Sequence, residues 1–119
     1  MQSLNSFLSQ NTSAINNGGS VALDFDFVAA GDFGCNSNAV ETLRNIVNLK
    51  PSVLLALGDL SYRPDSRCWL DMIAPLEGKV VVKIAIGYHD IFDGGQDLIQ
   101  SYLKHYNLTR QFYSFDYQN

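Results

Sequence analysis

Three apolar runs of this chain each end in a glycine that polar residues follow. The motifs read GDFG at 31–34, GDLSY at 58–62 and GYHD at 87–90. In a parallel sheet the carboxyl ends of neighbouring strands lie side by side, and ligands bind in the crevice there. The recurrence therefore predicts that two aspartates, a tyrosine and a histidine meet at one edge of a sheet.

The hydrophobic pattern predicts the elements between these motifs. Asn38 with Glu41 three residues later has the form of a capping box, and Pro51 and Pro75 are expected to stop the first two helices. The alternation of strand and helix indicates an α/β fold with a mainly parallel sheet flanked by helices. The expected strands are 21–30, 53–57, 80–86 and 111–117, and the expected helices are 38–49, 66–73 and 96–106.

The chain is organised as a short lead-in and one domain. Residues 1–20 are rich in Asn, Ser and Gly and are expected to be flexible, and residues 21–119 form the domain. The start lacks a basic region and a long apolar region, so no signal peptide is visible, although a mature secreted chain would look the same. No apolar stretch is long enough for a membrane span, and a net charge of -4 without a basic block argues against a nucleic-acid partner.

Asp32 and Asp59 each follow a strand-ending glycine. The glycine frees the backbone to turn, so that the carboxylate points into the crevice. A single such aspartate also fits a turn or a helix cap. Repetition at neighbouring strand ends favours a metal site, because hard cations prefer carboxylate oxygens and a shared carboxylate can bridge two of them.

The motifs resemble those of the calcineurin-like metallophosphoesterases, most closely the purple acid phosphatases. That family is marked by GDxG, then GDxxY, then GNHE or GNHD. Trp69 follows the second motif at a suitable distance, and the segment FYSFD at 112–116 resembles the family's YYSFD. The resemblance covers residues 25–117 and implies the first half of a four-layer metallophosphoesterase sandwich.

The resemblance also implies roles for the motif residues. Asp32 would bind the first metal, Asp59 would bridge both metals, and Tyr62 would be a phenolate ligand to a ferric ion. His89 would hydrogen-bond the phosphate or the leaving group of the substrate. The implied cofactor is a dinuclear site of iron with zinc, manganese or a second iron, and the implied reaction is phosphate monoester hydrolysis of the acid-phosphatase type. Members of the family are often secreted, but the compartment of this chain stays open.

Tyr88 is a departure, because it stands where the family has the asparagine that ligates the second metal. A tyrosine there can turn away, ligate a strongly acidic metal as phenolate, or fill the metal's place. A weakened second site is expected. Tyr62 and His89 also fit simpler roles, as an aromatic packed over the sheet edge and a loop histidine bonded to backbone.

The family's later motifs, an isolated histidine and a G-H-x-H pair, have no counterpart in a chain whose only histidines are His89 and His105. We therefore expect half a catalytic domain with weak or no activity alone. Its exposed sheet edge and apolar face predict a homo-oligomer or a complementing second half.

Two other kinds of protein fit the sequence less well. One is a non-enzymatic remnant or interaction domain that keeps the fold and a partial metal site. The other is a receiver-like domain, which would need a strand-end lysine that is not evident. Cys35 and Cys68 follow the first and second motifs and are expected to be free thiols, with a disulfide or a metal contact left open. Asp90 and Asp93 are expected to be loop residues.

Overall fold

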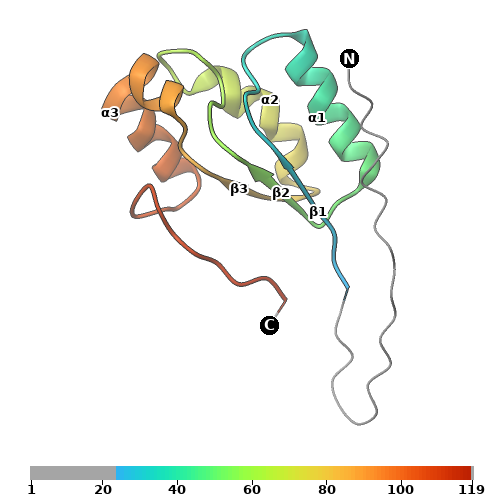
Figure 1. Cartoon of the computed structure of the whole chain (residues 1–119). Helices are drawn as coiled ribbons and strands as arrows, with labels where there is room; N and C mark the ends of the chain where they lie inside the picture. Colours follow the sequence, from blue (N-terminus) through green and yellow to red (C-terminus); the bar gives the residue numbers. More distant parts are fainter. Residues whose placement is uncertain (1–23, 119) are drawn as a thin grey trace.

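The computed structural model describes residues 24–118, and within them the chain forms a parallel sheet and three helices (Figure 1). The expected lead-in and the start of the first expected strand lie outside the described residues. The elements in chain order are β1 (Phe27–Ala30), α1 (Ser37–Leu49), β2 (Val53–Ala56), α2 (Arg67–Glu77), β3 (Val81–Ile84) and α3 (Tyr88–His105).

The sheet has the strand order β1-β2-β3, and both neighbouring pairs are parallel. Phe27 pairs with Val53, and Val53 pairs with Val81 on its other side. β2 is therefore central, which explains its uninterrupted apolar sequence. The predicted α/β fold with a parallel sheet is confirmed for the described part of the chain.

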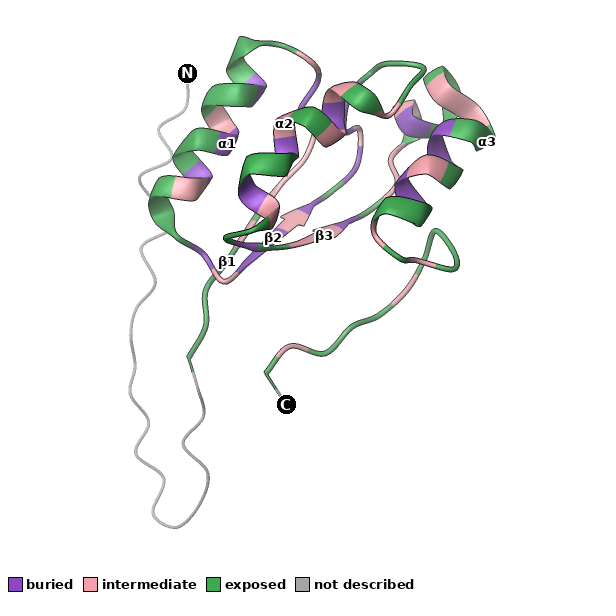
Figure 2. Ribbon diagram, turned by 180° about the vertical axis from the view of Figure 1, so that it is seen from behind, coloured by how far each residue is buried: buried purple, intermediate pink, exposed green. Residues whose placement is uncertain are grey.

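One face of the sheet is covered by helices and forms the core. Figures 1 and 2 show α1 and α2 lying over this face, with their buried residues turned toward it. Trp69 of α2 is fully buried at the centre, and its indole N–H donates to the hydroxyl of Tyr106 at 2.9 Å. Side chains from all three helices complete the core, among them Leu43, Ile46, Ile73, Leu76, Leu98 and Tyr102.

The opposite face of the sheet carries exposed apolar side chains. Phe27, Leu57 and Val81 are 58%, 57% and 40% exposed. The expected fourth strand at 111–117 is wrong, because no strand forms there. Instead, the Tyr113 hydroxyl accepts from the N–H of Ile84 at 3.1 Å and donates to its carbonyl at 2.7 Å. This side chain occupies the backbone groups of β3 that a fourth strand would need.

The first two helices differ from expectation at one end each. The N-cap of α1 is Asn36 rather than Asn38, because extended Asn36 lies where its Oδ1 accepts from the N–H of Ala39 at 3.0 Å. Pro75 does not stop α2, which continues to Glu77. Leu76 is almost completely buried beyond the proline, so core packing holds the last turn.

The third helix begins earlier than expected. The segment expected at 96–106 is present, but α3 starts at Tyr88 and joins two helical segments at Gly95, where φ is 61°. The expectation that Asp90 and Asp93 are loop residues is therefore wrong. The third strand-end motif forms the first turn of this helix.

Candidate metal centre

The three strand-end motifs are tied together through their backbones. The N–H of Asp32 donates to the carbonyl of Gly58 at 3.2 Å, and the N–H of Phe33 donates to the carbonyl of Asp59 at 3.1 Å. Gly58, at φ +90°, lies so near the third motif that a Cβ would stand 2.7 Å from the backbone nitrogen of Gly87. Only glycine permits this approach, so the three motifs share one edge of the sheet.

The three motifs also meet through the side chains of Asp32, Asp59, Tyr62 and His89. The Tyr62 hydroxyl donates to Oδ1 of Asp32 at 2.6 Å. Oδ1 of Asp59 accepts from the backbone N–H of His89 at 2.8 Å. The ring of His89 lies against the ring of Tyr62, with their centroids 4.5 Å apart. Four of the residues predicted as site residues therefore form one contiguous group.

Three members of this group have left-handed backbone conformations. Asp32, Asp59 and Tyr62 have φ of 54°, 51° and 54°. This region costs most L-residues other than glycine roughly 1–2 kcal/mol, and aspartate less, because its short polar side chain tolerates it. Such conformations persist where the surroundings hold them, and they cluster at functional sites. The strained positions coincide with the three residues predicted to ligate metal at the ends of β1 and β2.

Asp90 has a structural role at this edge of the sheet that the sequence did not predict. Its side chain is 1% exposed. Oδ2 accepts from the N–H groups of Asp59 at 2.9 Å and Gly87 at 2.8 Å, and Oδ1 accepts from that of Leu60 at 3.0 Å. Burial raises the pKa of the Asp90 carboxyl, and the three N–H donors act in the opposite direction. One carboxylate thus joins the second and third motifs.

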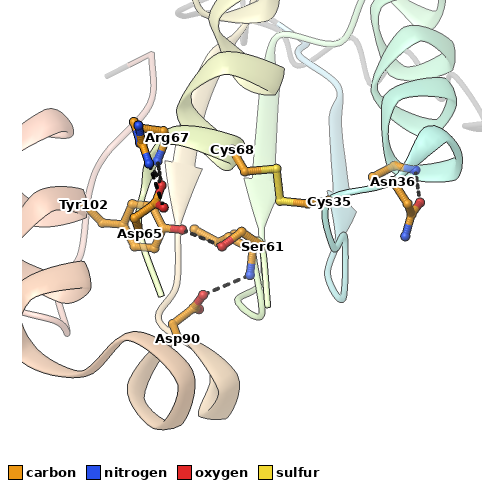
Figure 3. Close-up of a disulfide and its surroundings, with 10 residues drawn as sticks. Cys35, Asn36, Ser61, Asp65, Arg67, Cys68, Asp90 and Tyr102 are labelled. Atoms are coloured by element: carbon orange, nitrogen blue, oxygen red, sulfur yellow. Dashed lines mark hydrogen bonds and ion pairs between the residues drawn. A yellow bond between two sulfur atoms is a disulfide. The ribbon is translucent and has the colours of Figure 1, made fainter. Parts of the chain in front are cut away.

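The second motif has another anchor in α3. Ser61 is buried, and its hydroxyl lies 3.2 Å from the hydroxyl of Tyr102. Figure 3 shows these two side chains pointing toward each other. Burial raises the pKa of Tyr102 to about 12, so this phenol stays neutral and hydrogen-bonded at physiological pH. The loop that carries Asp59 and Tyr62 is therefore held by two residues of α3.

Cys35 and Cys68 form a disulfide, so the expectation of two free thiols is wrong (Figure 3). Their Cα atoms are 6.2 Å apart, within the range that the bond requires. The reason is the juxtaposition of the first two motifs, which brings together the chain segments that follow them. The bond links the segment after Asp32 to the first turn of α2.

Tyr88 lies beside this group and points elsewhere. It is 67% exposed, stacks on Phe92 with centroids 5.5 Å apart, and meets the ring of His89 edge-on. No hydrogen bond links it to Asp32, Asp59 or Tyr62. Its predicted role as a metal ligand stays a prediction.

Asp32, Asp59 and Tyr62 are the predicted metal ligands that this edge of the sheet brings together. Within residues 24–118, no point gathers three or more His, Cys, Asp or Glu side chains. Two carboxylates and a phenol are nevertheless oxygen donors of the kind that hard cations prefer. The hydrogen bond to Asp32, followed by burial and nearby carboxylates, raises the pKa of Tyr62 to about 12. A cation bound by both residues would replace the proton that they now share.

Comparison with known proteins adds no assignment. No protein-family model matches the chain, and no curated protein is significantly similar to it. In the part of the chain that the structure describes, no helix combines the length and apolar character of a membrane span. The features of this chain that bear on function are therefore its three motifs and their geometry at the strand ends.

Proposed function

We propose that residues 24–118 carry one side of a metal-dependent phosphoesterase site for phosphate monoesters, of the kind that the purple acid phosphatases have. The observation that carries this proposal is the 2.6 Å contact between Tyr62 and Asp32. It joins a carboxylate from the end of β1 to a phenol from the motif after β2. The family resemblance predicts that these two side chains share a ferric ion.

The proposal gives each side chain a role. Asp32 and Tyr62 would hold one cation, and Asp59 would be shared with a second, its carboxylate oriented by the N–H of His89. Bound cations of this kind supply an acidified water and offset the charge of the phosphate. His89 lies against Tyr62, and its Nδ1 is 3.0 Å from Oδ2 of Asp93, so Nε2 would be the ring atom that hydrogen-bonds the substrate.

These ligands leave the coordination of a metal pair incomplete. We propose that the remaining ligands come from a second copy or from a complementing second half of the phosphoesterase sandwich. The exposed sheet face with Phe27, Leu57 and Val81 supports this, since a partner would bury it. Small-angle scattering of a monodisperse monomer, unchanged over a wide concentration range, would argue against the second copy.

Metal titration tests the proposed ligands. Addition of Fe(III) is expected to produce a visible phenolate-to-iron absorption band, with metal content measured on the separated protein. Tyr62→Phe should abolish the band and Asp32→Ala should weaken it. Tyr117→Phe serves as the matched control and should keep the band. Wild-type protein without bound metal, or a band that survives Tyr62→Phe, would contradict the proposal.

A hydrolysis assay tests whether this chain has phosphoesterase activity without a partner. With iron, zinc or manganese added, we expect weak or no hydrolysis of p-nitrophenyl phosphate. Turnover equal to that of a purple acid phosphatase, and lost in Asp59→Asn, would refute the expectation of low activity.

A second candidate function is a non-enzymatic interaction domain that keeps the fold and part of the metal site. Two observations favour it: the small set of donors at the strand ends and the outward orientation of Tyr88. Absence of metal from the purified protein, with stoichiometric capture of a partner on the exposed sheet face, would support this function over hydrolysis.

A further inference from the structure

Two aromatic side chains stand exposed and stacked at the start of α3. Tyr88 and Phe92 are 67% and 70% exposed, and their rings are nearly parallel, at 13°, with centroids 5.5 Å apart. Large apolar side chains gain free energy when another surface covers them. We call this stacked pair the aromatic platform. Its open surface is suited to a further ring, because aromatic groups pack favourably in offset stacks and edge-on contacts.

The aromatic platform is continuous with the candidate metal centre. The ring of Tyr88 meets the ring of His89 edge-on at 5.4 Å. The ring of His89 lies 4.5 Å from that of Tyr62, whose hydroxyl donates to Asp32. A line of aromatic rings therefore leads from the predicted ligands to the platform. Tyr88, the nearer member of the platform, is separated from Tyr62 by the ring of His89.

The size of the platform favours a small ligand over a protein surface. Only Ile91, at 49% exposed, adds a neighbouring apolar side chain on the same helical segment. A stable protein interface buries roughly 800 Å² on each partner, contributed by about 20–30 residues. Three side chains fall far below that requirement, whereas one aromatic ring is matched by a stacked pair.

We infer that Tyr88 and Phe92 bind the aromatic leaving group of an aryl phosphate monoester. This inference rests on the proposed function, because the phosphate of the same substrate would lie at Asp32, Asp59 and Tyr62. It gives Tyr88 a role in which the ring matters rather than the hydroxyl. The proposed site therefore prefers phosphate esters of phenols, or of other aromatic alcohols, over those of small alkyl alcohols.

Binding of two non-hydrolysable phosphonates tests the inference. Phenylphosphonate and methylphosphonate are titrated into the metal-loaded full chain, and dissociation constants are measured by calorimetry. We expect phenylphosphonate to bind roughly three- to tenfold more tightly. Phe92→Ala should reduce this preference to near unity. Phe112→Ala removes a similarly exposed aromatic outside the strand-end motifs and outside the exposed sheet face, and it should leave the preference intact.

A conservative variant separates the platform from metal ligation by Tyr88. Tyr88→Phe keeps the ring and removes the hydroxyl, so the phenyl preference should persist. Lower metal content in this variant, with loss of the preference, would assign Tyr88 to the metal and overturn the inference.

The metal content of each protein distinguishes the two proposals. Bound metal with equal affinity for both phosphonates, or a preference retained in Phe92→Ala, overturns the aromatic platform and leaves the proposed function standing. Wild-type protein that binds no metal overturns the proposed function, and the inference fails with it.

Discussion

Asp90 joins two of the strand ends through one carboxylate, so its removal tests how the candidate metal centre is held together. Asp90→Ala leaves the N–H groups of Asp59, Leu60 and Gly87 without their acceptor. A buried donor without a partner costs about 1–3 kcal/mol. Water entering the vacated space relieves part of this, so we expect a loss of about 3–5 kcal/mol. That is a large share of the roughly 5–15 kcal/mol that stabilises a domain.

Urea unfolding followed by far-ultraviolet circular dichroism measures this loss. With a slope near 2 kcal/mol per molar urea, the midpoint should fall by about 2 M. Asp90→Asn keeps one carbonyl oxygen but turns an amide toward an N–H donor, so its loss should be intermediate. Asp97→Ala is the matched control, because Asp97 is an exposed acid of the same helix and its removal should cost less than about 0.5 kcal/mol.

Equal midpoints for Asp90→Ala and Asp97→Ala would refute this reasoning. They would mean that the close approach of Gly58 and Gly87 is maintained without the carboxylate. An Asn variant less stable than the Ala variant would also contradict it, since hydrogen bonds rather than shape are expected to dominate.

Other predictions follow from the contacts around the same edge. Replacing Cys35 and Cys68 with serine should lower the free energy of unfolding by about 4 kcal/mol, because the bond closes a loop across a sequence separation of 33; urea unfolding that matches the wild type would exclude this. The pKa of Tyr62 is raised to about 12, so the folded state favours the neutral phenol. The resulting contribution to the free energy of unfolding is present below pH 10 and is lost as the pH rises toward 12. A carbon NMR titration of Asp32→Ala should show the Tyr62 midpoint moving toward 10, and an unchanged midpoint would show that Asp32 is not the cause. Tyr113→Phe frees the edge of β3 and should increase self-association in light scattering, whereas an unchanged mass would argue against edge protection.

The strands were predictable because burial dictates their composition. β2 lies between two partners, and its apolar run at 53–57 shows this directly. The first strand was predicted to be longer than the described β1. The reason is the register: Phe27 pairs with Val53, where β2 begins, so Asp26 reaches β2 through its carbonyl oxygen alone and residues 24–26 are not paired as a strand. Alternation alone does not reveal where the neighbouring strand starts.

The first half of α3 was not predicted because it contains two glycines. Gly94 and Gly95 are poor helix formers and suggest a loop. In the structure Gly94 is required by packing, because a Cβ there would collide with the side chain of Leu98. Gly95 provides the kink between the two helical segments. With the helix hidden, Asp90 was not recognised, although its place three residues after Gly87 is that of a capping-box acid.

The disulfide and the tail depend on contacts between distant segments. Cys35 and Cys68 both follow strand-end motifs, which suggests proximity without establishing a bond. The tail alternates like a strand, but it forms none, and its Tyr113 side chain hydrogen-bonds the backbone of Ile84 in β3 instead. In both places the outcome is decided by where a single side chain lies, and periodicity carries no information on that.

The left-handed residues at the strand ends cost the fold free energy, which supports a functional centre there. Asp32 and Tyr62 both have left-handed backbones, which costs Tyr62 roughly 1–2 kcal/mol and Asp32 less, because aspartate tolerates this region. Their mutual hydrogen bond has a carboxylate acceptor, and such a bond contributes about 1.5–3 kcal/mol, which solvent reduces at this exposed position. Glycine at either position would remove the strain. Two residues with left-handed backbones, joined at an exposed position by one hydrogen bond, are consistent with the proposal that Asp32 and Tyr62 share a cation. The Asp90 carboxylate and the disulfide hold the loops that carry these strained residues in place.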